Sequence, residues 1–485
     1  MWSGRPRAPH RLFRVQSISH RCSTTATSRR QVAPAPTTLD AHAASVDGPY
    51  DAIVVGGGVI GCSTAYNLAK RGASVLLVER RGIAAEQSSK SWGFCRQQGR
   101  DFRELPMMVE SIAAWKGLES ELGWDVGWQQ GGNLALIQSE ADRAAKLRWA
   151  AAAQPYGVET AILDRAGVEE ILPGMAAGSA VIGGMWTESD GSADPEKATA
   201  AFAAGATTHG AQFLLGSNVH ALATSEHGRH GRGMSQAGRV EGVVLDTGET
   251  IHAPIVVVAT AGWTDGLLRR SGVGLSIPML RLHATAGQTE PLPTASGGST
   301  GCPFPTAGVW AKGISFRLRK DGGLTIADGG QLEEHDIGLE TLLHGWRFLP
   351  LLRQNYASAH FKLRRDSFPT PRVDACPEPA EARLELAQEN FRKLFPALPP
   401  LRITRSWAGF IDITPDMLPV IDGRAVEGLF LSCGYSGHGL GIAPAAGRLT
   451  AELALGMESA SVEAAAFRAS RLTHGGLWVA PNALI

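Results

Sequence analysis

The pattern of apolar and polar residues is clearest where the folded part of the chain begins. An apolar run at 50–55 predicts a short strand of the fully buried kind, and a helical pattern follows at 59–71. Gly72 is expected to end this helix, and a second buried strand is predicted at 73–78. Together these segments predict a complete βαβ unit.

The rest of the chain mixes helical and strand patterns, which predicts an α/β protein with room for two domains. Further helices are predicted at 102–122, 140–152, 196–209, 339–343, 380–394 and 442–455. Further strands are predicted at 130–137, 211–219, 239–245, 250–252, 255–259, 314–318, 324–327 and 429–432. Asp194 and Pro195 are expected at the N-cap and first position of the helix at 196–209. The Gly-, Ser- and His-rich segment 227–238 is typical of an exposed loop.

Composition narrows the classes of partner and ligand. The chain has 485 residues, 44% of them hydrophobic, and its 46 basic residues balance 46 acidic ones. This balance argues against nucleic acid or an anionic membrane surface as the main partner. No apolar stretch approaches the ~18–20 residues of a membrane span. The six cysteines are scattered without metal-type spacing, which indicates a reducing compartment and no metal site.

The N-terminal segment has a composition of its own. Residues 1–39 contain seven arginines, no lysine and no acid, and serine and threonine are dense at 17–28. This composition is typical of an organelle transit peptide, and it predicts that residues 1–46 are a transit peptide and linker for the mitochondrial matrix. A disordered basic leader that carries no targeting signal is the alternative.

A glycine-rich motif joins the first predicted strand to its helix: Gly56-Gly57-Gly58-Val59-Ile60-Gly61. In this strand–helix context, G-x-G-x-x-G is the fingerprint of dinucleotide binding. Gly56 makes the tight turn, Gly58 admits a pyrophosphate at the helix N-terminus, and Gly61 permits close packing. Glu79 follows at the end of the second strand, where a carboxylate accepts hydrogen bonds from ribose hydroxyls. The motif does not separate FAD from NAD, and a glycine turn without a ligand is the alternative.

Three separated motifs carry a more specific resemblance. Residues 51–89, with the pair Ser88-Ser89, resemble the N-terminus of the D-amino-acid oxidase superfamily, which includes sarcosine oxidase, glycine oxidase and dimethylglycine dehydrogenase. The segment Arg405-Ser406-Trp407-Ala408-Gly409, continuing into 414–421, resembles the superfamily's W-x-G…T-P-D-x-x-P-x-I segment. The loop Gly434-Tyr435-Ser436-Gly437-His438-Gly439 resembles its G-[YF]-S-G-H-G loop.

The resemblance implies FAD as the cofactor and a particular architecture. A glutathione-reductase-like Rossmann domain for FAD is expected from residues 47–100, 195–265 and 405–475, with an inserted α+β substrate domain from 101–194 and 266–404. Non-covalent binding is expected, because Gly93 stands where members that tether flavin through histidine carry that residue. Besides 56–61, the expected cofactor contacts are Glu79, Arg80, Ser88, Ser89, Val219, Ala261, Gly262, Gly437, His438, Gly439, Leu440 and Gly441.

The third motif precedes a helix that is expected to begin near Ile442. Backbone N–H groups at such a helix start would favour negative charge on a reduced flavin and thereby favour hydride transfer. His438 can add a hydrogen bond or a charge, or it can merely pack over the cofactor, and both readings stay open. Sarcosine oxidase carries a lysine at the position of Gly441, so a carboxylate is held differently here or is absent from the substrate.

Arg96 is the candidate for binding the substrate. In sarcosine oxidase-like enzymes an arginine at the matching place grips the substrate carboxylate, a task suited to its planar, bidentate guanidinium. A surface salt bridge is the alternative, because Arg100 and Asp101 lie nearby. Arg281 and Arg317 are weaker candidates. Aromatic residues such as Trp128, Trp310 and Phe316 either wall the pocket or belong to the core.

The resemblance implies an FAD-dependent oxidoreductase that oxidises the C–N bond of a small amine or amino acid by hydride transfer to flavin N5. The electron acceptor is expected to be oxygen or a quinone or flavoprotein. Two alternatives stay open: a 2-hydroxy-acid dehydrogenase of the same superfamily, and a flavin-binding assembly factor for a mitochondrial respiratory complex.

Overall fold

The computed structural model describes most of the chain. The described residues are 48–225, 238–293, 308–311, 313–330, 333–337, 345–349, 359–363, 377–458 and 462–473. The predicted transit peptide, the helix at 339–343 and nearly all of the loop at 227–238 lie outside these residues.

A mostly parallel six-stranded sheet contains the predicted βαβ unit. Its strand order is β21-β22-β13-β1-β2-β9, and only the β21–β22 pair is antiparallel. In that order the strands are Val420–Val426, Leu429–Cys433, Ile255–Val258, Ala52–Val55, Val75–Glu79 and Gln212–Leu215. β1 lies inside the sheet with all its residues buried, which explains why 52–55 is uniformly apolar instead of alternating.

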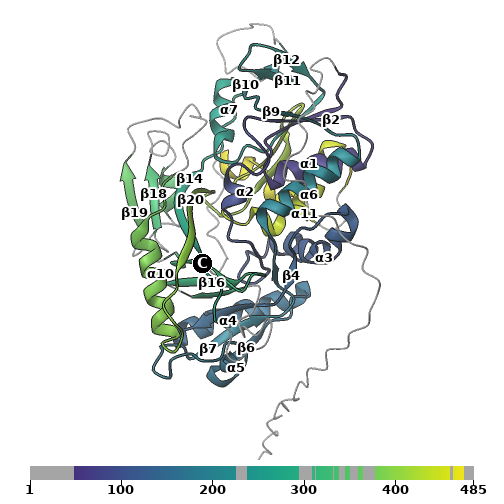
Figure 1. Ribbon diagram of the computed structural model, residues 1–485. Coiled ribbons are helices and arrows are strands. Elements are labelled where there is room, and N and C mark those ends of the chain that lie inside the picture. Colours follow the sequence, from purple (N-terminus) through teal and green to yellow (C-terminus); the bar gives the residue numbers. More distant parts are fainter. Residues whose placement is uncertain are drawn as a thin grey trace, which may run out of the picture.

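Helices α1 (Val59–Lys70), α6 (Pro195–Thr208) and α11 (Gly439–Ala454) cover this sheet, and α3 (Leu105–Leu122) packs against α11. Figure 1 shows α1, α6 and α11 side by side in purple, teal and yellow, although they come from the beginning, the middle and the end of the chain. The Asp194 side chain accepts hydrogen bonds from the backbone N–H groups of residues 196 and 197, which confirms the predicted N-cap of α6.

A ten-stranded sheet forms the second layer. Its order is β19-β18-β14-β17-β16-β15-β5-β7-β6, and β20 also pairs with β14. The strands are, in that order, Ala359–Leu363, Glu333–Ile337, Leu280–Thr289, Leu324–Ala327, Ile314–Leu318, Val309–Ala311, Asn133–Ile137, Gly183–Thr187, Ala161–Asp164 and, for β20, Ile403–Ile413. Helix α10 (Glu381–Leu394) packs against one face of this sheet.

Two small sheets and several shorter helices complete the described fold. A small sheet joins β3 (Phe94–Cys95), β8 (Gly191–Ser192) and β4 (Gln129–Gln130), and another joins β10 (Val219–Thr224), β11 (Val240–Leu245) and β12 (Thr250–His252). The other α-helices of the described residues are α2 (Gln87–Lys90), α4 (Glu140–Ala153), α5 (Arg165–Ile171), α7 (Thr264–Arg270) and α12 (Ser470–Thr473). The predicted α/β class is confirmed.

Several predicted boundaries were wrong, among them the start of the helix predicted at 102–122, which begins at Leu105. The strand predicted at 130–137 is two strands, because the turn at 131–132 moves the chain from β4 beside β8 to β5 beside β7. The strand predicted at 211–219 divides likewise between β9, which pairs with β2, and β10, which pairs with β11. The last long helix begins at Gly439 instead of near Ile442, so Gly441 lies in its first turn.

The division into domain segments stays a prediction, with one observation on its last boundary. β20 pairs with β14 along almost its whole length, from Ile403 to Ile413. Residues 403–413 therefore extend the large sheet, although residue 405 was expected to begin the third cofactor segment.

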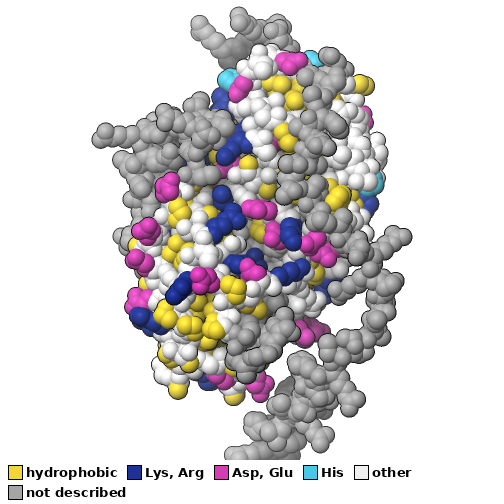
Figure 2. Space-filling view, viewed as in Figure 1, with side chains coloured by type: hydrophobic (Ala, Val, Ile, Leu, Met, Phe, Trp, Pro, Cys, Tyr) yellow, Lys and Arg dark blue, Asp and Glu magenta, His cyan; other side chains and the backbone are white. Residues whose placement is uncertain are grey.

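Charged side chains of both signs are interspersed over the face of the molecule in Figure 2. That face therefore presents no extended field of a single sign. Within the described part of the chain, every helix is too short or too polar to cross a membrane.

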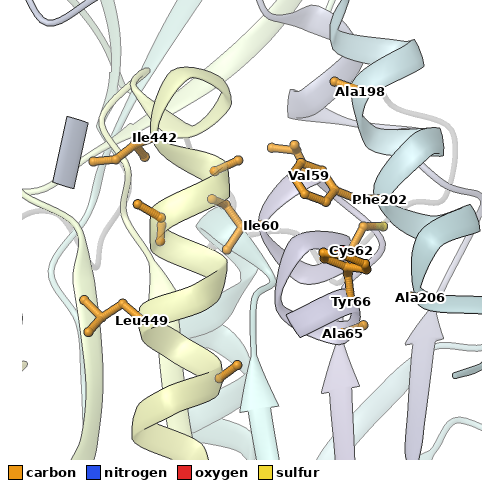
Figure 3. Close-up of a cluster of buried hydrophobic side chains, with 14 of the residues drawn as sticks. Val59, Ile60, Cys62, Ala65, Tyr66, Ala198, Phe202, Ala206, Ile442 and Leu449 are labelled. Carbon is orange, nitrogen blue, oxygen red and sulfur yellow. The ribbon is translucent and has the colours of Figure 1, made fainter. Parts of the chain in front are cut away.

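The hydrophobic core around α1 fixes the position of the glycine motif, which leads into this helix. Figure 3 shows Val59, Cys62 and Tyr66 of α1 packed with Phe202 of α6, while Ile60 faces α11. These contacts bury most of α1 and hold its N-terminus at the end of β1. The sheet and its helices thus position the start of α1 rigidly.

Candidate functional site

One large cavity lies between the two sheets. It has a volume of about 460 Å³. Its walls come from the ends of β1, β2 and β13, from the loop before α11, and from β15, β16 and β20 of the large sheet. We call it the main cavity. It runs from the glycine motif and Glu79 past Trp263 to His438 and Arg96.

The glycine motif closes tightly on the neighbouring backbone. A Cβ at Gly56 would lie 2.5 Å from the carbonyl oxygen of Ala259, and a Cβ at Gly61 would lie 1.9 Å from that of Gly56. The two positions therefore exclude any side chain. The N–H of Gly57 donates to Glu79 Oε2 at 2.7 Å, and the N–H of Val59 donates to Ser88 Oγ at 2.9 Å.

Most of the predicted site residues line the main cavity. They are Gly56, Gly57, Gly58, Val59, Ile60, Glu79, Arg80, Ser88, Arg96, Val219, Ala261, Gly437, His438, Gly439 and Leu440. The motifs lie far apart in the sequence, and the fold brings them to one continuous wall.

Four predicted residues do not line the main cavity. Gly61 packs under the glycine turn, and Gly262 lies against the Asp412 carboxylate, 2.3 Å from the position of its missing Cβ. Ser89 Oγ donates to the carbonyl of Glu86 at 3.0 Å. The Gly441 carbonyl accepts a hydrogen bond from Trp115 Nε1 at 2.8 Å, since this glycine lies inside the first turn of α11.

His438 stands at the N-cap of α11 and pairs with a buried carboxylate. Its Nδ1 lies 3.1 Å from Oε2 and 3.2 Å from Oε1 of Glu104, the residue before α3. Burial and the nearby Arg100 hold the pKa of His438 below its ordinary value. Burial alone would raise the pKa of Glu104, but His438 and Arg100 lower it. A neutral imidazole beside an ionised carboxylate is the state that these shifts favour.

Arg96 faces the main cavity instead of forming the surface salt bridge considered above. Its guanidinium lies 4.7 Å from the ring centre of Trp310, and its Nη1 donates to the Gln98 carbonyl. Asp101 pairs instead with Arg103, at 2.9 Å. Burial and the neighbouring Arg100 lower the pKa of Arg96 to about 9. An anion beside Arg96 would stabilise the charged guanidinium and offset the unfavourable free energy of burying it.

A network of buried amides holds this part of the cavity. The Gln98 side chain accepts from Trp310 Nε1 at 3.2 Å and from Asn133 Nδ2 at 2.6 Å. The carboxylate of Asp190, which is fully buried, accepts from the backbone N–H of Gln97 at 2.8 Å. Trp310 and Arg96 are thereby fixed by strands of the large sheet.

Sequence reasoning missed Arg100 and Glu104 as parts of the site. Arg100 is only 3% exposed and lines the main cavity. Its Nε donates to the Arg96 carbonyl at 3.1 Å, which leaves other nitrogens of the guanidinium for the cavity. The signal available in the sequence was spacing: Arg96, Arg100 and Glu104 recur every four residues.

A second missed group lies midway along the main cavity. Asp412 is buried, and burial raises its pKa although Arg281 and a hydrogen bond from the Gln87 side chain oppose the shift. The Arg281 guanidinium lies 4.6 Å from the ring centre of Phe410. Arg281 thus supports the cavity wall beside Asp412.

The other candidates lie elsewhere. Trp128 stacks on Trp115 with ring centres 5.9 Å apart and packs against the core, and Phe316 is fully buried against Phe391, so neither lines the main cavity. Arg317 donates through Nε to the carbonyl of Trp92, behind the cavity wall. Within the described residues, no cluster of His, Cys, Asp and Glu side chains is suited to a metal.

The residues of the main cavity fit a dinucleotide. Three buried nitrogens on its wall lack a hydrogen-bond partner in the described part of the chain: Arg80 Nη1, Arg100 Nη1 and Trp263 Nε1. Buried donors of this kind are ordinarily satisfied, so these three indicate a ligand rich in acceptors. The helix starts of α1 and α11 add two positive dipole ends to the same cavity.

Comparison with known proteins gives a consistent family. The family model described as FAD dependent oxidoreductase (DAO) matches residues 51–453. Sarcosine oxidase subunit beta of Rhizobium meliloti (strain 1021) is 26% identical over 435 residues, which are 88% of this chain and 89% of that protein. Glycine oxidase of Bacillus licheniformis is 25% identical over 434 residues, 87% of this chain and 97% of that protein. The crystal structure of L-proline dehydrogenase from P. horikoshii superposes with a TM-score of 0.71 at 26% identity, covering 88% of this chain and 99% of that one.

Proposed function

Since this chain belongs to the DAO family of FAD-dependent oxidoreductases, we propose that it oxidises the C–N bond of a small amine or amino acid in the main cavity. The family and the relatives establish the coarser statement, that the chain is an FAD-dependent enzyme of the group acting on amines and amino acids. The substrate and the roles of individual residues are proposals.

The dinucleotide is proposed to lie along the glycine motif, held without a covalent bond. The start of α1 faces its pyrophosphate, Glu79 faces a ribose, and Arg80 with Trp263 lines the intervening wall. The other predicted contacts on the wall, from Ser88 and Val219 to the loop at 437–440, complete the proposed cradle. The chemistry that FAD supplies when bound is acceptance of a hydride at N5 from the carbon next to the amine nitrogen.

Arg96 and Arg100 are proposed to bind the carboxylate of the substrate. Both line the main cavity, and Arg100 keeps an unpartnered buried nitrogen there. Guanidinium groups bind carboxylates through paired, charge-assisted hydrogen bonds, which fix the orientation of the substrate. This arrangement replaces the lysine that sarcosine oxidase carries at the position of Gly441.

His438 is proposed to take the proton that an ammonium substrate must lose. Hydride loss needs the nitrogen lone pair, so the amine has to be neutral when it reacts. Glu104 contacts Nδ1 of His438, which leaves Nε2 as the lone-pair nitrogen of the neutral imidazole. The single observation that carries the proposal is this juxtaposition of two arginines and a neutral histidine on one cavity wall.

The absorbance of the purified full chain, recorded anaerobically with an amine panel, tests the proposal. The panel holds sarcosine, dimethylglycine, glycine, proline, pipecolate and D-amino acids, with a 2-hydroxy acid as control. Bleaching of the flavin bands by one amine is expected, and readmitted air then separates oxygen from a quinone or flavoprotein as acceptor. Bleaching by the hydroxy acid alone would favour a hydroxy-acid dehydrogenase. A flavin that no substrate bleaches would favour an assembly role.

The mitochondrial matrix is the proposed location. Its support is the arginine-rich, acid-free composition of residues 1–39. Fusion of residues 1–46 to a fluorescent protein tests this location directly. A transit peptide would carry the reporter into mitochondria, and a leader without a targeting signal would leave the reporter outside them.

A further inference from the structure

A row of polar side chains crosses four adjacent strands of the large sheet. Arg317 on β16 pairs with Thr325 on β17, and Thr325 pairs in turn with Gln288 on β14. Gln288 pairs with Arg405 on β20. Directly paired residues on neighbouring strands project from the same face of a sheet. The row Arg317–Thr325–Gln288–Arg405 therefore presents its four side chains together.

The opposite face of the same strands is apolar and covered. Phe316, Leu324 and Ile326 alternate with the row and pack in one cluster with Phe391 and other residues of α10. Their burial fixes the register, because a slip of one residue would exchange the two faces. The polar row is thus held in place by the core behind it.

All four residues of the row line a second cavity of about 310 Å³. Trp407, two residues beyond Arg405 on β20, continues the face of the row, and the start of α6, from Asp194 to Lys197, lines the cavity together with Ser89 and Ser91. We call it the second cavity. Five cationic side chains and three acidic ones line it: Lys197, Arg317, Arg319, Lys320 and Arg405 against Asp194, Glu196 and Asp321.

The acids at the second cavity are already engaged. Asp194 caps α6 through backbone N–H groups, and Asp321 pairs with Arg319. Glu196 faces Arg405 at 3.5 Å, and Lys197 turns away to Asp125 at 2.6 Å. The charge of Asp194 raises the pKa of Arg317, but within the described part of the chain no ion pair joins Arg317 to a carboxylate.

Two donors in the row lack partners. Arg317 uses only Nε, toward the Trp92 carbonyl, and its terminal nitrogens make no hydrogen bond to any described residue. Thr325 is 4% exposed, and its Oγ1 has no hydrogen-bond partner in the described part of the chain. Burial lowers the pKa of Arg317, which means that its charge is poorly solvated. A guanidinium and a hydroxyl left unpaired side by side match the oxygens of an anion.

We propose that the second cavity binds a small molecule through a carboxylate or phosphate group, which accepts hydrogen bonds from Arg317 and Thr325. Gln288 and Arg405 extend the row and offer further donors to the rest of the ligand. The site is separate from the main cavity, and the proposal does not depend on which amine is oxidised there.

The occupant would lie directly behind the wall of the main cavity. Ser91 lines both cavities, and Trp92, whose carbonyl accepts from Arg317, lines the main one. A Cβ at Gly93 would lie 2.6 Å from Arg317 Nη2, so this segment touches the guanidinium closely. Anion binding at Arg317 is therefore expected to change the fluorescence of the bound flavin or of tryptophan.

Calorimetric titration of the full-length holoprotein tests the site. FAD is kept in excess so that the main cavity is filled, and pyrophosphate, inorganic phosphate and citrate are titrated at constant ionic strength, with chloride as the reference. Saturable binding of at least one of them is expected. Preference for citrate would identify a carboxylate ligand, and preference for pyrophosphate a phosphate ligand.

Three variants decide whether the row carries the binding. Thr325→Val keeps the shape of the side chain and removes only the unpaired hydroxyl, so binding should weaken about tenfold without loss of thermal stability. Arg317→Gln should abolish saturable binding. Arg148→Gln makes the same change of charge on the exposed surface of α4, outside both cavities, and should leave the affinity within about threefold. No saturable binding by any of the three anions, or equal weakening in all three variants, would overturn the proposal.

Discussion

The imidazole of His438, on the wall of the main cavity, lies 3.1 Å from the buried carboxylate of Glu104, although 334 residues separate them in the chain. Glu104 is fully buried just before α3, and His438 caps α11. The packing of α3 on α11 therefore decides which ring nitrogen of His438 is directed to the carboxylate. Fixing the tautomer in this way is a common role for a buried acid beside histidine.

Glu104→Gln should lower the pKa of His438 further, because the carboxylate raises that pKa against the effects of burial and Arg100. The acidic limb of kcat/KM set by His438 should then move to lower pH. The rate at the optimum should fall by about 10–100-fold, since glutamine orients the ring less firmly. The pH profile of kcat/KM with one amine substrate measures both effects.

The double variant Glu104→Gln, His438→Asn is the control for this assignment. The pKa of the substrate ammonium is the same for every variant, so its contribution cancels in the comparison. Glu104→Gln is expected to shift the acidic limb of the pH profile of kcat/KM only when His438 is present. If the same shift persists when His438 is asparagine, that limb reports the titration of another group, and Glu104 does not act through His438.

Gly61→Ala should prevent retention of FAD. The added Cβ would lie 1.9 Å from the Gly56 carbonyl oxygen, so α1 has to move away from β1, and the proposed cradle for the dinucleotide would be distorted. Gly82→Ala is the matched control, because nothing lies within 4 Å of the added Cβ there. The ratio of flavin to protein absorbance after purification is the measurement. Full flavin content in Gly61→Ala would show that the close packing is unnecessary.

The glycine motif was predictable because its signals are local. Gly56, Gly61 and Glu79 follow from a strand–turn–helix pattern that the chain needs wherever a helix start approaches a phosphate. Strands β16 and β17 were predicted with their observed bounds, since their alternation is regular and clear turns flank them. Local patterns therefore predicted the end of the main cavity that the glycine motif and Glu79 line.

The opposite end of the main cavity and the second cavity were less predictable, because the contacts that build them join residues distant in the chain. Nothing near Glu104 indicates that its partner is His438, and nothing near Thr325 indicates that its hydroxyl stays unpaired. The early start of α11 was missed because three glycines at 437–441 resemble a loop, while packing against α1 and α3 stabilises the helix there. Tertiary contacts decided each of these features.

Arg96→Lys should raise KM for a carboxylate-bearing amine by about 10–100-fold, with a smaller effect on kcat. Lysine keeps the charge but loses the paired donors and the planar stacking on Trp310, which lies 4.7 Å from the guanidinium. An amine without a carboxylate should show no such change. Steady-state kinetics with both kinds of substrate separate lost recognition from general damage.

Arg103→Lys is the matched control for that substitution. Arg103 lies seven residues away and pairs with Asp101 outside the main cavity, at 2.9 Å. It should leave both kinetic constants nearly unchanged. Equal KM changes in the two variants, or an equal loss with both kinds of substrate, would contradict a role for Arg96 in binding the carboxylate.

The free energy of unfolding should depend on pH because Asp190 titrates differently in the folded and unfolded chain. Burial raises the pKa of this carboxyl from 3.8 to about 6 in the folded chain, despite the backbone N–H groups that it accepts from. Between these values the folded state keeps a proton that the unfolded state has released. Asp190 therefore contributes most at low pH, and its contribution is lost as the pH rises through about 6. The loss should amount to at most about 3 kcal/mol.

Asp190→Asn removes this titration, so comparison with the wild type separates the contribution of Asp190 to the pH dependence from that of the other carboxyls. Urea unfolding of both proteins, each with the same excess of FAD, gives the free energy of unfolding at several values from about pH 4 to pH 7. The wild-type value minus the variant value should fall across this range, because only the wild type loses its proton. A difference that rises with pH would mean that Arg96 and the N–H donors of Gln97 outweigh burial, and that Asp190 is an ionised anchor of the loop carrying both cavity arginines.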